Sequence, residues 1–165
     1  MPYEPSAQSS FLRQRWCVNI DPGDYTYKVE KVDMVEGIVE ALRELKKRGY
    51  EFIVITNQGG IAKGLYSYDD VKAVNKAITS FLGDRGIAIL DIYYCPHHTD
   101  YGKCLCRKPD SLLLEKAAAR YGVDKSKSYF VGDKQRDIDA GEKAGIEGVL
   151  IGVNEDLGNY LNRFC

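Results

Sequence analysis

Residues 52–60 read FIVITNQGG, in which four apolar residues lead directly into a polar segment with two glycines. A continuous apolar run of this length is typical of a strand buried on both faces of a parallel sheet. Binding sites in such sheets lie at the edge formed by the carboxyl ends of the strands. The segment therefore predicts a parallel sheet and the edge of that sheet at which a site forms.

The sequence on either side alternates between helical and strand patterns. Before residue 52, Ile38, Leu42 and Leu45 recur at helical spacing, and Gly49 follows as a helix stop. The elements predicted after residue 60 are a helix at 67–82, a strand at 87–94, a helix at 111–121, a strand at 129–131, a helix at 136–144 and a strand at 148–151. This alternation predicts a three-layer, Rossmann-like α/β fold with a central parallel sheet and no large cap domain.

Length and composition limit the class of protein. The 165 residues, 44% hydrophobic and 28% charged, fit one domain over 1–165, in which 1–10 form a loose arm. The net charge of −1, with basic residues spread along the chain, disfavours a nucleic-acid partner. No run approaches the roughly 18 apolar residues of a membrane span, and a signal-peptide pattern is absent. We expect a cytoplasmic monomer without a membrane partner.

Three of the five cysteines fall in one short loop, residues 95–109, together with two histidines. Without a secretion signal, cysteines favour metal binding or free thiols over disulfides. Cys95, Cys104 and Cys106 with one imidazole suit a closed, structural zinc site that pins the loop. His97 is the preferred imidazole and His98 the alternative; reduced thiols around a loop histidine are the other interpretation. The remaining cysteines lie far away in the sequence and are not expected to be ligands: Cys17 and Cys165.

Three strand ends carry residues suited to phosphate chemistry. The Thr56 hydroxyl and the backbone N–H groups after it can hold a phosphoryl oxygen. Lys108, beside Arg107, can neutralise charge on a transferring phosphoryl group. Asp133 and Asp137 place two carboxylates at a strand end and in the next helical turn, as Mg²⁺ requires. Each signal alone also fits a turn, a solvated basic pair or a helix cap, but together they favour phosphate handling.

Four motifs carry a resemblance to a known family: ITNQGGIAKG (55–64), IYYCPHH (92–98), CLCRKP (104–109) and YFVGDKQRDI (129–138). With them the chain resembles the haloacid-dehalogenase-like phosphatases, in the branch of D-glycero-D-manno-heptose 1,7-bisphosphate phosphatase and histidinol-phosphate phosphatase. TNQ, GGIAKG and GDK look closer to the heptose enzyme. The resemblance covers most of residues 35–151.

The resemblance implies removal of a phosphate monoester from a small sugar phosphate, through an aspartyl-phosphate. The substrate implied is the 7-phosphate of the heptose bisphosphate, with histidinol phosphate as the alternative. It implies phosphate contacts from Thr56 and Lys108, and Mg²⁺ on Asp133 with Asp137 as a weaker ligand. The implied zinc ligands are Cys95, His97, Cys104 and Cys106. The implied substrate contacts are Asn57, Gln58, Arg107 and Lys134, and we add Asp21 as a further candidate for substrate binding.

The first family motif is missing from the sequence. The family requires D-x-D-G at the end of the first strand, where one carboxylate attacks phosphorus and the other protonates the leaving oxygen. The family spacing places Arg13 and Arg15 at these positions. An arginine cannot attack phosphorus, and two guanidinium groups would repel Mg²⁺. We therefore expect the chain as printed to be inactive, or to bind sugar phosphates without catalysis. Asp21 and Asp24 are an alternative pair, but they lie later and at a different spacing.

The genetic code offers a third interpretation of RQRWCVN, residues 13–19. The codons CGA CAG AGA TGG TGT GTT AAT encode it, and starting one nucleotide later they read GAC AGA GAT GGT GTG TTA, which is DRDGVL, the missing motif. Our hypothesis is that residues up to about Val18 are the product of two compensating frame shifts, in the gene or in its sequencing, on an ordinary phosphatase. The coding DNA tests this, because a codon 13 other than NGA contradicts it.

Overall fold

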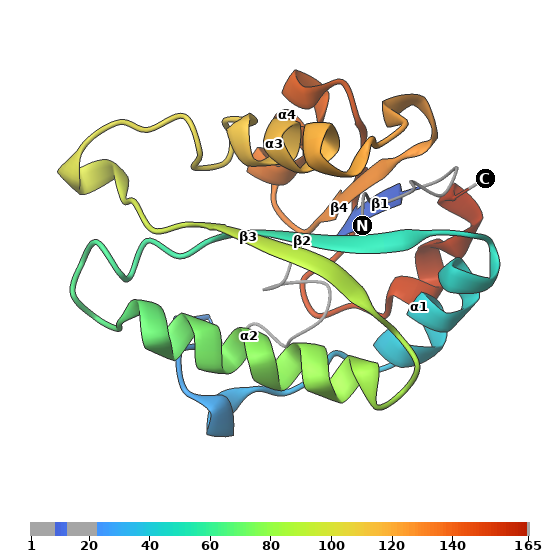
Figure 1. Cartoon of the computed structure of the whole chain (residues 1–165), viewed down its shortest axis with the longest axis horizontal. Helices are drawn as coiled ribbons and strands as arrows, with labels where there is room; N and C mark the ends of the chain where they lie inside the picture. The colour runs from blue at the N-terminus through green and yellow to red at the C-terminus, as the bar shows by residue number, and fades with distance from the viewer. Residues whose placement is uncertain (1–8, 13–22, 165) are drawn as a thin grey trace.

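The computed structural model of the protein describes the backbone of residues 9–12 and 23–164 and the side chains of 23–164. Its five strands form one parallel sheet in the order β3-β2-β1-β4-β5 (Figure 1). The strands are β1 (Ser9–Leu12), β2 (Glu51–Asn57), β3 (Ile89–Cys95), β4 (Tyr129–Gly132) and β5 (Glu147–Leu150). The α-helices are α1 (Ile38–Lys47), α2 (Tyr68–Gly83), α3 (Leu112–Tyr121) and α4 (Gln135–Ala144). Four 3-10 turns complete the described elements: η1 (Val29–Lys31), η2 (Thr99–Tyr101), η3 (Lys125–Lys127) and η4 (Leu157–Arg163).

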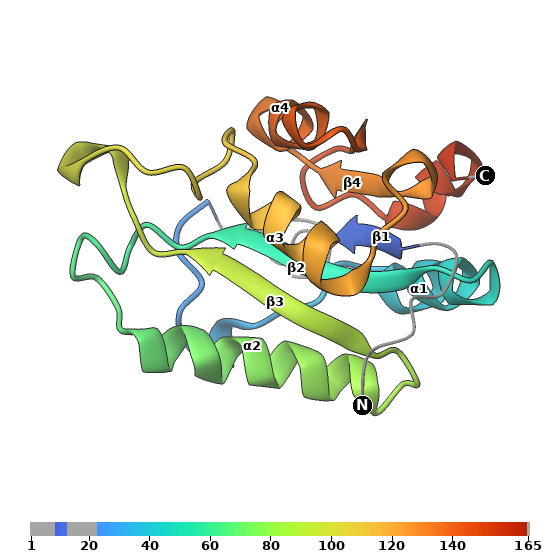
Figure 2. The ribbon, with the colours of Figure 1, turned by 45° about the horizontal axis from the view of Figure 1, so that its top comes forward.

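Helices cover both faces of the sheet, so two hydrophobic cores form (Figure 2). On one face, α1, α2 and η4 pack against side chains such as Phe52 and Val131. On the other face, α3 and α4 pack against Ile53, Ile55 and Phe130. The apolar run of β2 therefore supplies both cores, as its lack of polar alternation predicts. The predicted Rossmann-like class is confirmed.

Strand β1 lies at the centre of the sheet and ends at Leu12. Its register pairs Leu12 with Val54 on β2 and with Val131 on β4. The strand begins at Ser9, so the last two residues of the arm expected over residues 1–10 belong to the sheet instead. Arg13 follows Leu12 directly in the chain. The predicted site residues Arg13, Arg15 and Asp21 lie outside the described residues.

The helices begin and end where local chemistry directs them. Ser67 caps α2 by accepting a hydrogen bond from the Asp70 amide, while the Asp70 carboxylate accepts one from the Ser67 amide. Helices α3 and α4 both end at glycines with positive φ, Gly122 and Gly145. Of the helices described, none has the length and apolar character needed to cross a lipid bilayer.

The C-terminal segment packs onto the edge of the sheet opposite the candidate site. The ring of Phe164 lies edge-on to Tyr129 and Tyr50, with centroids 5.2 and 6.3 Å away. Arg48 Nη1 donates to the carbonyl oxygens of Leu161 and Phe164 at 2.8 and 3.1 Å. The segment therefore closes the core beneath α1, a role that its sequence alone does not indicate.

Candidate active site and metal centre

The ammonium group of Lys108 lies between the end of β2 and the start of α4. Its Nζ donates to the Ile55 carbonyl oxygen at 2.8 Å and lies 3.1 Å from Oδ1 of Asp137. Both charged side chains are 0% exposed. A buried charge without its partner costs several kcal/mol, so Asp137 holds the Lys108 ammonium at the strand ends.

Asp137 is also part of the first turn of α4. Its Oδ2 accepts a hydrogen bond from the Lys134 amide at 3.2 Å. Gly132 gives it room, because a Cβ there would lie 2.3 Å from the Cβ of Asp137. One oxygen thus faces Lys108 and the other caps the helix, so the geometry makes Asp137 a partner of Lys108. Its weaker Mg²⁺ role stays a prediction.

Asp133 follows Gly132 at the end of β4 and is 8% exposed. Its Oδ2 lies 3.5 Å from Nζ of Lys134, whose side chain is 39% exposed. Mg²⁺ is usually held by one or two carboxylates together with substrate phosphate oxygens and waters. Asp133 fits one such position. The matching positions after β1 are those of Arg13 and Arg15, outside the described residues.

Thr56, Asn57 and Gln58 are all buried where β2 ends. The Asn57 side chain donates to the Lys108 carbonyl oxygen at 3.2 Å and accepts from the Lys108 amide at 3.1 Å. Gln58 Nε2 donates to the Thr56 hydroxyl oxygen at 3.3 Å. The predicted substrate contacts Asn57 and Gln58 therefore position Lys108 and Thr56, and their contact with substrate stays a prediction.

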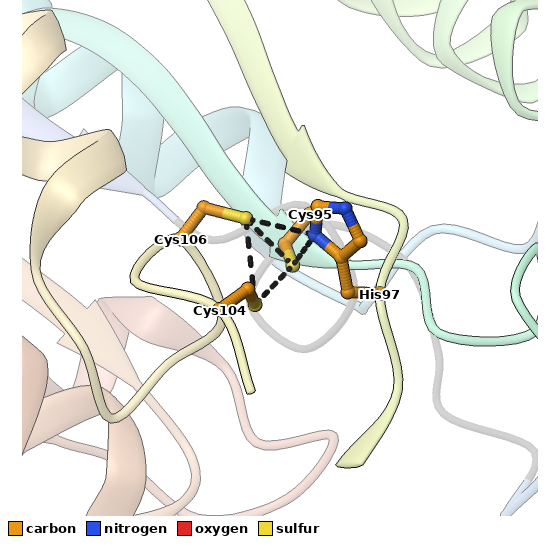
Figure 3. A group of neighbouring side chains, drawn as sticks. All are labelled: Cys95, His97, Cys104 and Cys106. Atoms are coloured by element: carbon orange, nitrogen blue, oxygen red, sulfur yellow. Dashed lines mark hydrogen bonds between the residues drawn. The ribbon is translucent and has the colours of Figure 1, made fainter. Parts of the chain in front are cut away.

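The structure gathers Cys95, His97, Cys104 and Cys106 into one cluster, with all four ligand atoms within 4.8 Å of one another (Figure 3). The three sulfur atoms are 3.0, 3.6 and 3.7 Å apart. Nδ1 of His97 lies 3.2 Å from the Cys106 sulfur and 3.5 Å from the Cys95 sulfur. Zinc bound to sulfur at about 2.3 Å in a tetrahedron requires sulfur–sulfur edges of about 3.8 Å. The donor set fits zinc, as do the two sulfur–sulfur edges at Cys104, while the Cys95 and Cys106 sulfurs lie closer together than in such a tetrahedron.

The three thiols of the cluster differ in acidity. Burial raises the pKa of Cys95, and burial also raises that of Cys106. Burial opposes ionisation of Cys104 as well, but hydrogen bonds to its sulfur from the Arg107 amide and the Cys106 side chain lower its pKa overall. A bound cation would lower the pKa values of all three thiols and hold them as thiolates.

The structure distinguishes the two histidines of the loop formed by residues 95–109, called the Cys/His loop below. Nδ1 of His98 accepts a hydrogen bond from the Asp100 amide at 3.2 Å, so His98 faces away from the thiols. His97, the preferred imidazole, completes the cluster. Arg107, a predicted substrate contact, donates from Nη1 to the His97 carbonyl oxygen at 2.9 Å. It thus also supports the metal centre.

The Cys/His loop is fastened to the loop that follows β2. The Gln58 amide donates to the Cys95 carbonyl oxygen at 2.7 Å, and the Ala62 amide donates to the Pro96 carbonyl oxygen at 3.2 Å. Both loops leave the same edge of the sheet (Figure 1). A metal ion that orders one loop therefore also supports the other.

A cavity of about 420 Å³ opens beside the Cys/His loop. Lys103, Arg107 and Lys108 line it together with one carboxylate, Asp110. Ligand cavities of small molecules commonly have volumes of about 300 to 1,000 Å³. Much of the lining is apolar, and of its charged groups Lys108 pairs with Asp137 and Asp110 with Lys143. Lys103 and Arg107 are the cationic groups there that suit a phosphate-bearing ligand.

Sequence reasoning missed Tyr66, which is 6% exposed and contacts both Gln58 and Gly60. The sequence signal was a single aromatic residue between the glycine-bearing loop and the Ser67 cap. Such a position is common in unremarkable loops, so only the tertiary contacts give it meaning.

An open parallel sheet whose strand ends carry a buried lysine, a threonine and a carboxylate defines an α/β protein that handles phosphoryl groups. The sequence model of the haloacid dehalogenase-like hydrolases matches residues 13–145. The chain belongs to this family.

Relatives of known name are similar over most of the chain. D-glycero-beta-D-manno-heptose-1,7-bisphosphate 7-phosphatase of Pasteurella multocida is 38% identical over 147 residues, which are 86% of this chain and 79% of the relative. The enzyme of the same name from Haemophilus influenzae is 38% identical over an aligned length of 165 residues including gaps, and the alignment covers 92% of this chain and 89% of the relative.

A solved structure shows the same fold. The D,D-heptose 1.7-bisphosphate phosphatase of B. bronchiseptica, complexed with magnesium and phosphate, aligns with a TM-score of 0.82 and 28% identity. The alignment covers 94% of this chain and 86% of that one. The resemblance in the sequence motifs is thus confirmed at the level of the family and the fold.

Proposed function

We propose that this protein has the fold and site of a phosphatase that removes the 7-phosphate of D-glycero-D-manno-heptose 1,7-bisphosphate. The names of its relatives support the substrate. The observation that carries the proposal is the buried Lys108 ammonium at the strand ends, held by Asp137. Such a fixed charge needs no reorganisation when a phosphoryl group arrives.

The described residues have distinct roles in this proposal. Lys108 neutralises charge on the transferring phosphoryl group, and the Thr56 hydroxyl donates a hydrogen bond to one of its oxygens. Arg107 lines the cavity, where it would bind the polar remainder of the substrate, as would Lys134 beside Asp133. Lys108, Thr56 and Asp137 are buried, and low access of water would strengthen the electrostatic effect of Lys108.

Two metals belong to the proposal. Zn²⁺ is structural and is bound by Cys95, His97, Cys104 and Cys106, a set that fits it in donor type. Mg²⁺ is catalytic, with Asp133 as its ligand among the described residues, and when bound it supplies neutralisation of phosphoryl oxygens. The solved relative complexed with magnesium and phosphate supports this assignment.

The chain as printed has no nucleophile at the family position, because Arg13 and Arg15 stand there. With carboxylates restored, one oxygen of residue 13 would attack phosphorus, and the sugar oxygen would leave with a proton from residue 15. Water would then hydrolyse the aspartyl-phosphate. We propose that the printed chain lacks this turnover, and that the two arginines favour a second function, binding of sugar phosphates without catalysis.

The test compares two forms of the full chain with Mg²⁺: the printed sequence and a variant with FFDRDGVLN in place of residues 11–19. Phosphate release is measured with heptose 1,7-bisphosphate and with histidinol phosphate. We expect no turnover by the first form and turnover of the heptose substrate by the second. Preference for histidinol phosphate would move the assignment to that branch.

The matched control keeps Arg13 in the replaced segment, which removes the nucleophile and leaves the other changes in place. Turnover by this control, or by the printed chain after mutation of Asp21 and Asp24, contradicts our placement of the motif. Gel filtration of the same samples tests the further proposals of a single domain over 1–165 and a monomer. Cell fractionation tests a cytoplasmic location.

A further inference from the structure

Tyr66 links three parts of the loop that follows β2. Its hydroxyl lies 2.8 Å from Oε1 of Gln58 and 3.3 Å from the amide nitrogen of Gly60. Gln58 in turn reaches the Thr56 hydroxyl through Nε2 at 3.3 Å. The four residues form one continuous series of hydrogen bonds that begins at a backbone amide and ends at Thr56.

The direction of this series follows from the donors and acceptors available. The Gly60 amide can only donate, so the Tyr66 oxygen accepts from it. The Gln58 side chain is oriented with Oε1 toward Tyr66, and this orientation makes the Tyr66 hydroxyl the donor to Oε1. With Oε1 placed there, the Nε2 group, which can only donate, faces Thr56. The Thr56 oxygen is then an acceptor, and its own proton is left to be donated elsewhere.

We propose that Tyr66 is a positioning residue that fixes the side-chain amide of Gln58, so that the Thr56 hydroxyl presents its proton to a phosphoryl oxygen. This inference rests on the proposed role of Thr56 as a phosphate contact. Without the Tyr66 hydroxyl, the Gln58 amide can turn over and present Oε1 to Thr56. The Thr56 proton would then be donated to Gln58 instead of to the ligand.

The ring of Tyr66 is held firmly enough for this role. Tyr27 stacks on it with centroids 5.3 Å apart and an interplanar angle of 10°, and Tyr25 lies edge-on at 5.5 Å. On another side, a Cβ at Gly60 would lie 2.0 Å from Cε1 of Tyr66, so only glycine leaves space for the ring. Ring packing and hydroxyl chemistry can therefore be separated by substitution.

The first arm of the experiment needs no ligand. The full chain is compared with Tyr66→Phe, which keeps the ring, and with the matched control Tyr27→Phe, which removes a hydroxyl from the stacked neighbour. The side-chain amide signals of Gln58 are followed by NMR. We expect Tyr66→Phe to shift both signals and to speed exchange of their protons with water, whereas Tyr27→Phe leaves them in place. Unchanged Gln58 signals in Tyr66→Phe overturn the proposal.

The second arm measures affinity for inorganic phosphate with Mg²⁺, and KM and kcat in the chain that carries FFDRDGVLN at residues 11–19. Loss of one hydrogen bond to a charged ligand predicts about ten-fold weaker phosphate binding and a similar rise in KM for Tyr66→Phe. In Gln58→Glu, a carboxylate, which can only accept hydrogen bonds, faces Thr56. This variant should show the same weaker phosphate binding and higher KM as Tyr66→Phe. A fall in kcat with KM and phosphate affinity unchanged indicates a merely structural role and overturns the proposal.

The two arms separate this inference from the proposed function. A parent chain that binds neither phosphate nor substrate overturns the function, and the Gln58 signals then decide on Tyr66 by themselves. If the parent chain and Tyr66→Phe bind phosphate equally well, the proposed function stands and the proposed role of Tyr66 is overturned.

Discussion

Two neighbouring loops at the same edge of the sheet are held in place by different means. The loop after β2 (residues 58–66) has buried residues at both ends, including Gln58 and Tyr66, which hydrogen-bond to each other. The Cys/His loop has no buried residue from Pro96 to Arg107. It is held by the four-ligand cluster and by two backbone hydrogen bonds to the first loop.

The difference shows what a loop needs when it must carry a site. A loop whose side chains reach the interior can be fixed by hydrogen bonds and ring packing, because burial makes unpaired polar groups costly. A loop that lies wholly at the surface has no such support and needs a cross-link. Lys108 sits where the second loop returns to the interior, and so depends on both.

Loss of zinc should have the largest effect, and it should be strongest in the Cys/His loop, with a smaller effect on the loop after β2 through the two backbone hydrogen bonds that join them. Structural zinc sites bind with apparent free energies of about 10 to 16 kcal/mol. We expect one zinc per chain by elemental analysis, and loss of it in Cys106→Ser together with rapid proteolysis between residues 96 and 107. Cys165→Ser is the control. Full zinc content in Cys106→Ser would refute the ligand assignment.

Lys108→Met should have the next largest effect, because it leaves the Asp137 carboxylate buried without its ammonium partner. Breaking a buried ion pair costs about 3 to 5 kcal/mol, which urea unfolding measures. Lys134→Met removes the partly exposed partner of the buried Asp133 and should cost less than Lys108→Met, because solvent screens the Lys134 side of the pair. Adding Asp137→Leu to Lys108→Met should recover part of the loss. Equal effects of Lys108→Met and Lys134→Met would mean that the Lys108 pair is not buried.

Asn57→Ala should weaken the connection between the two loops. It removes both hydrogen bonds to the Lys108 backbone, at a cost of about 2 kcal/mol in the free energy of unfolding. Hydrogen exchange of the Lys108 amide should quicken in the same variant. The exposed Asn159→Ala, expected within about 0.5 kcal/mol of the parent, is the comparison. Unchanged slow exchange of the Lys108 amide in Asn57→Ala would show that the two hydrogen bonds between Asn57 and the Lys108 backbone are not needed to hold this segment.

Ser67→Ala should have the smallest effect, about 1 kcal/mol, because it removes the cap of α2 just after the first loop. Hydrogen bonds from the Ser67 amide and hydroxyl lower the pKa of Asp70 in the fold. The cap's contribution is therefore present above the unfolded pKa of Asp70 and is lost as pH falls through the folded value. The difference between Ser67→Ala and its parent should shrink in acid, with Lys76→Ala as the helix control.

Much of the site could be predicted because its signals are local. Cys95 to Cys106 are close in the chain, so their spacing alone indicated a metal site, and the cluster in the structure fits it. The pairing of Lys108 with Asp137 joins residues 29 positions apart and could not be read from spacing. Tyr66 was missed for another reason: its partners are only six and eight residues away, but they lie in a turn whose path the sequence does not give.

The sequence by itself determined the alternation of strands and helices, the family, and the absence of carboxylates at residues 13 and 15, because these depend on the order and type of residues. Only the tertiary structure decided which histidine joins the thiols, which carboxylate holds Lys108 and which side chains contact Gln58. These depend on distances between segments that meet at the strand ends. At the strand ends the polar groups are buried, so each must pair with whichever group lies within hydrogen-bonding distance, and a shift of a few ångströms would change its partner.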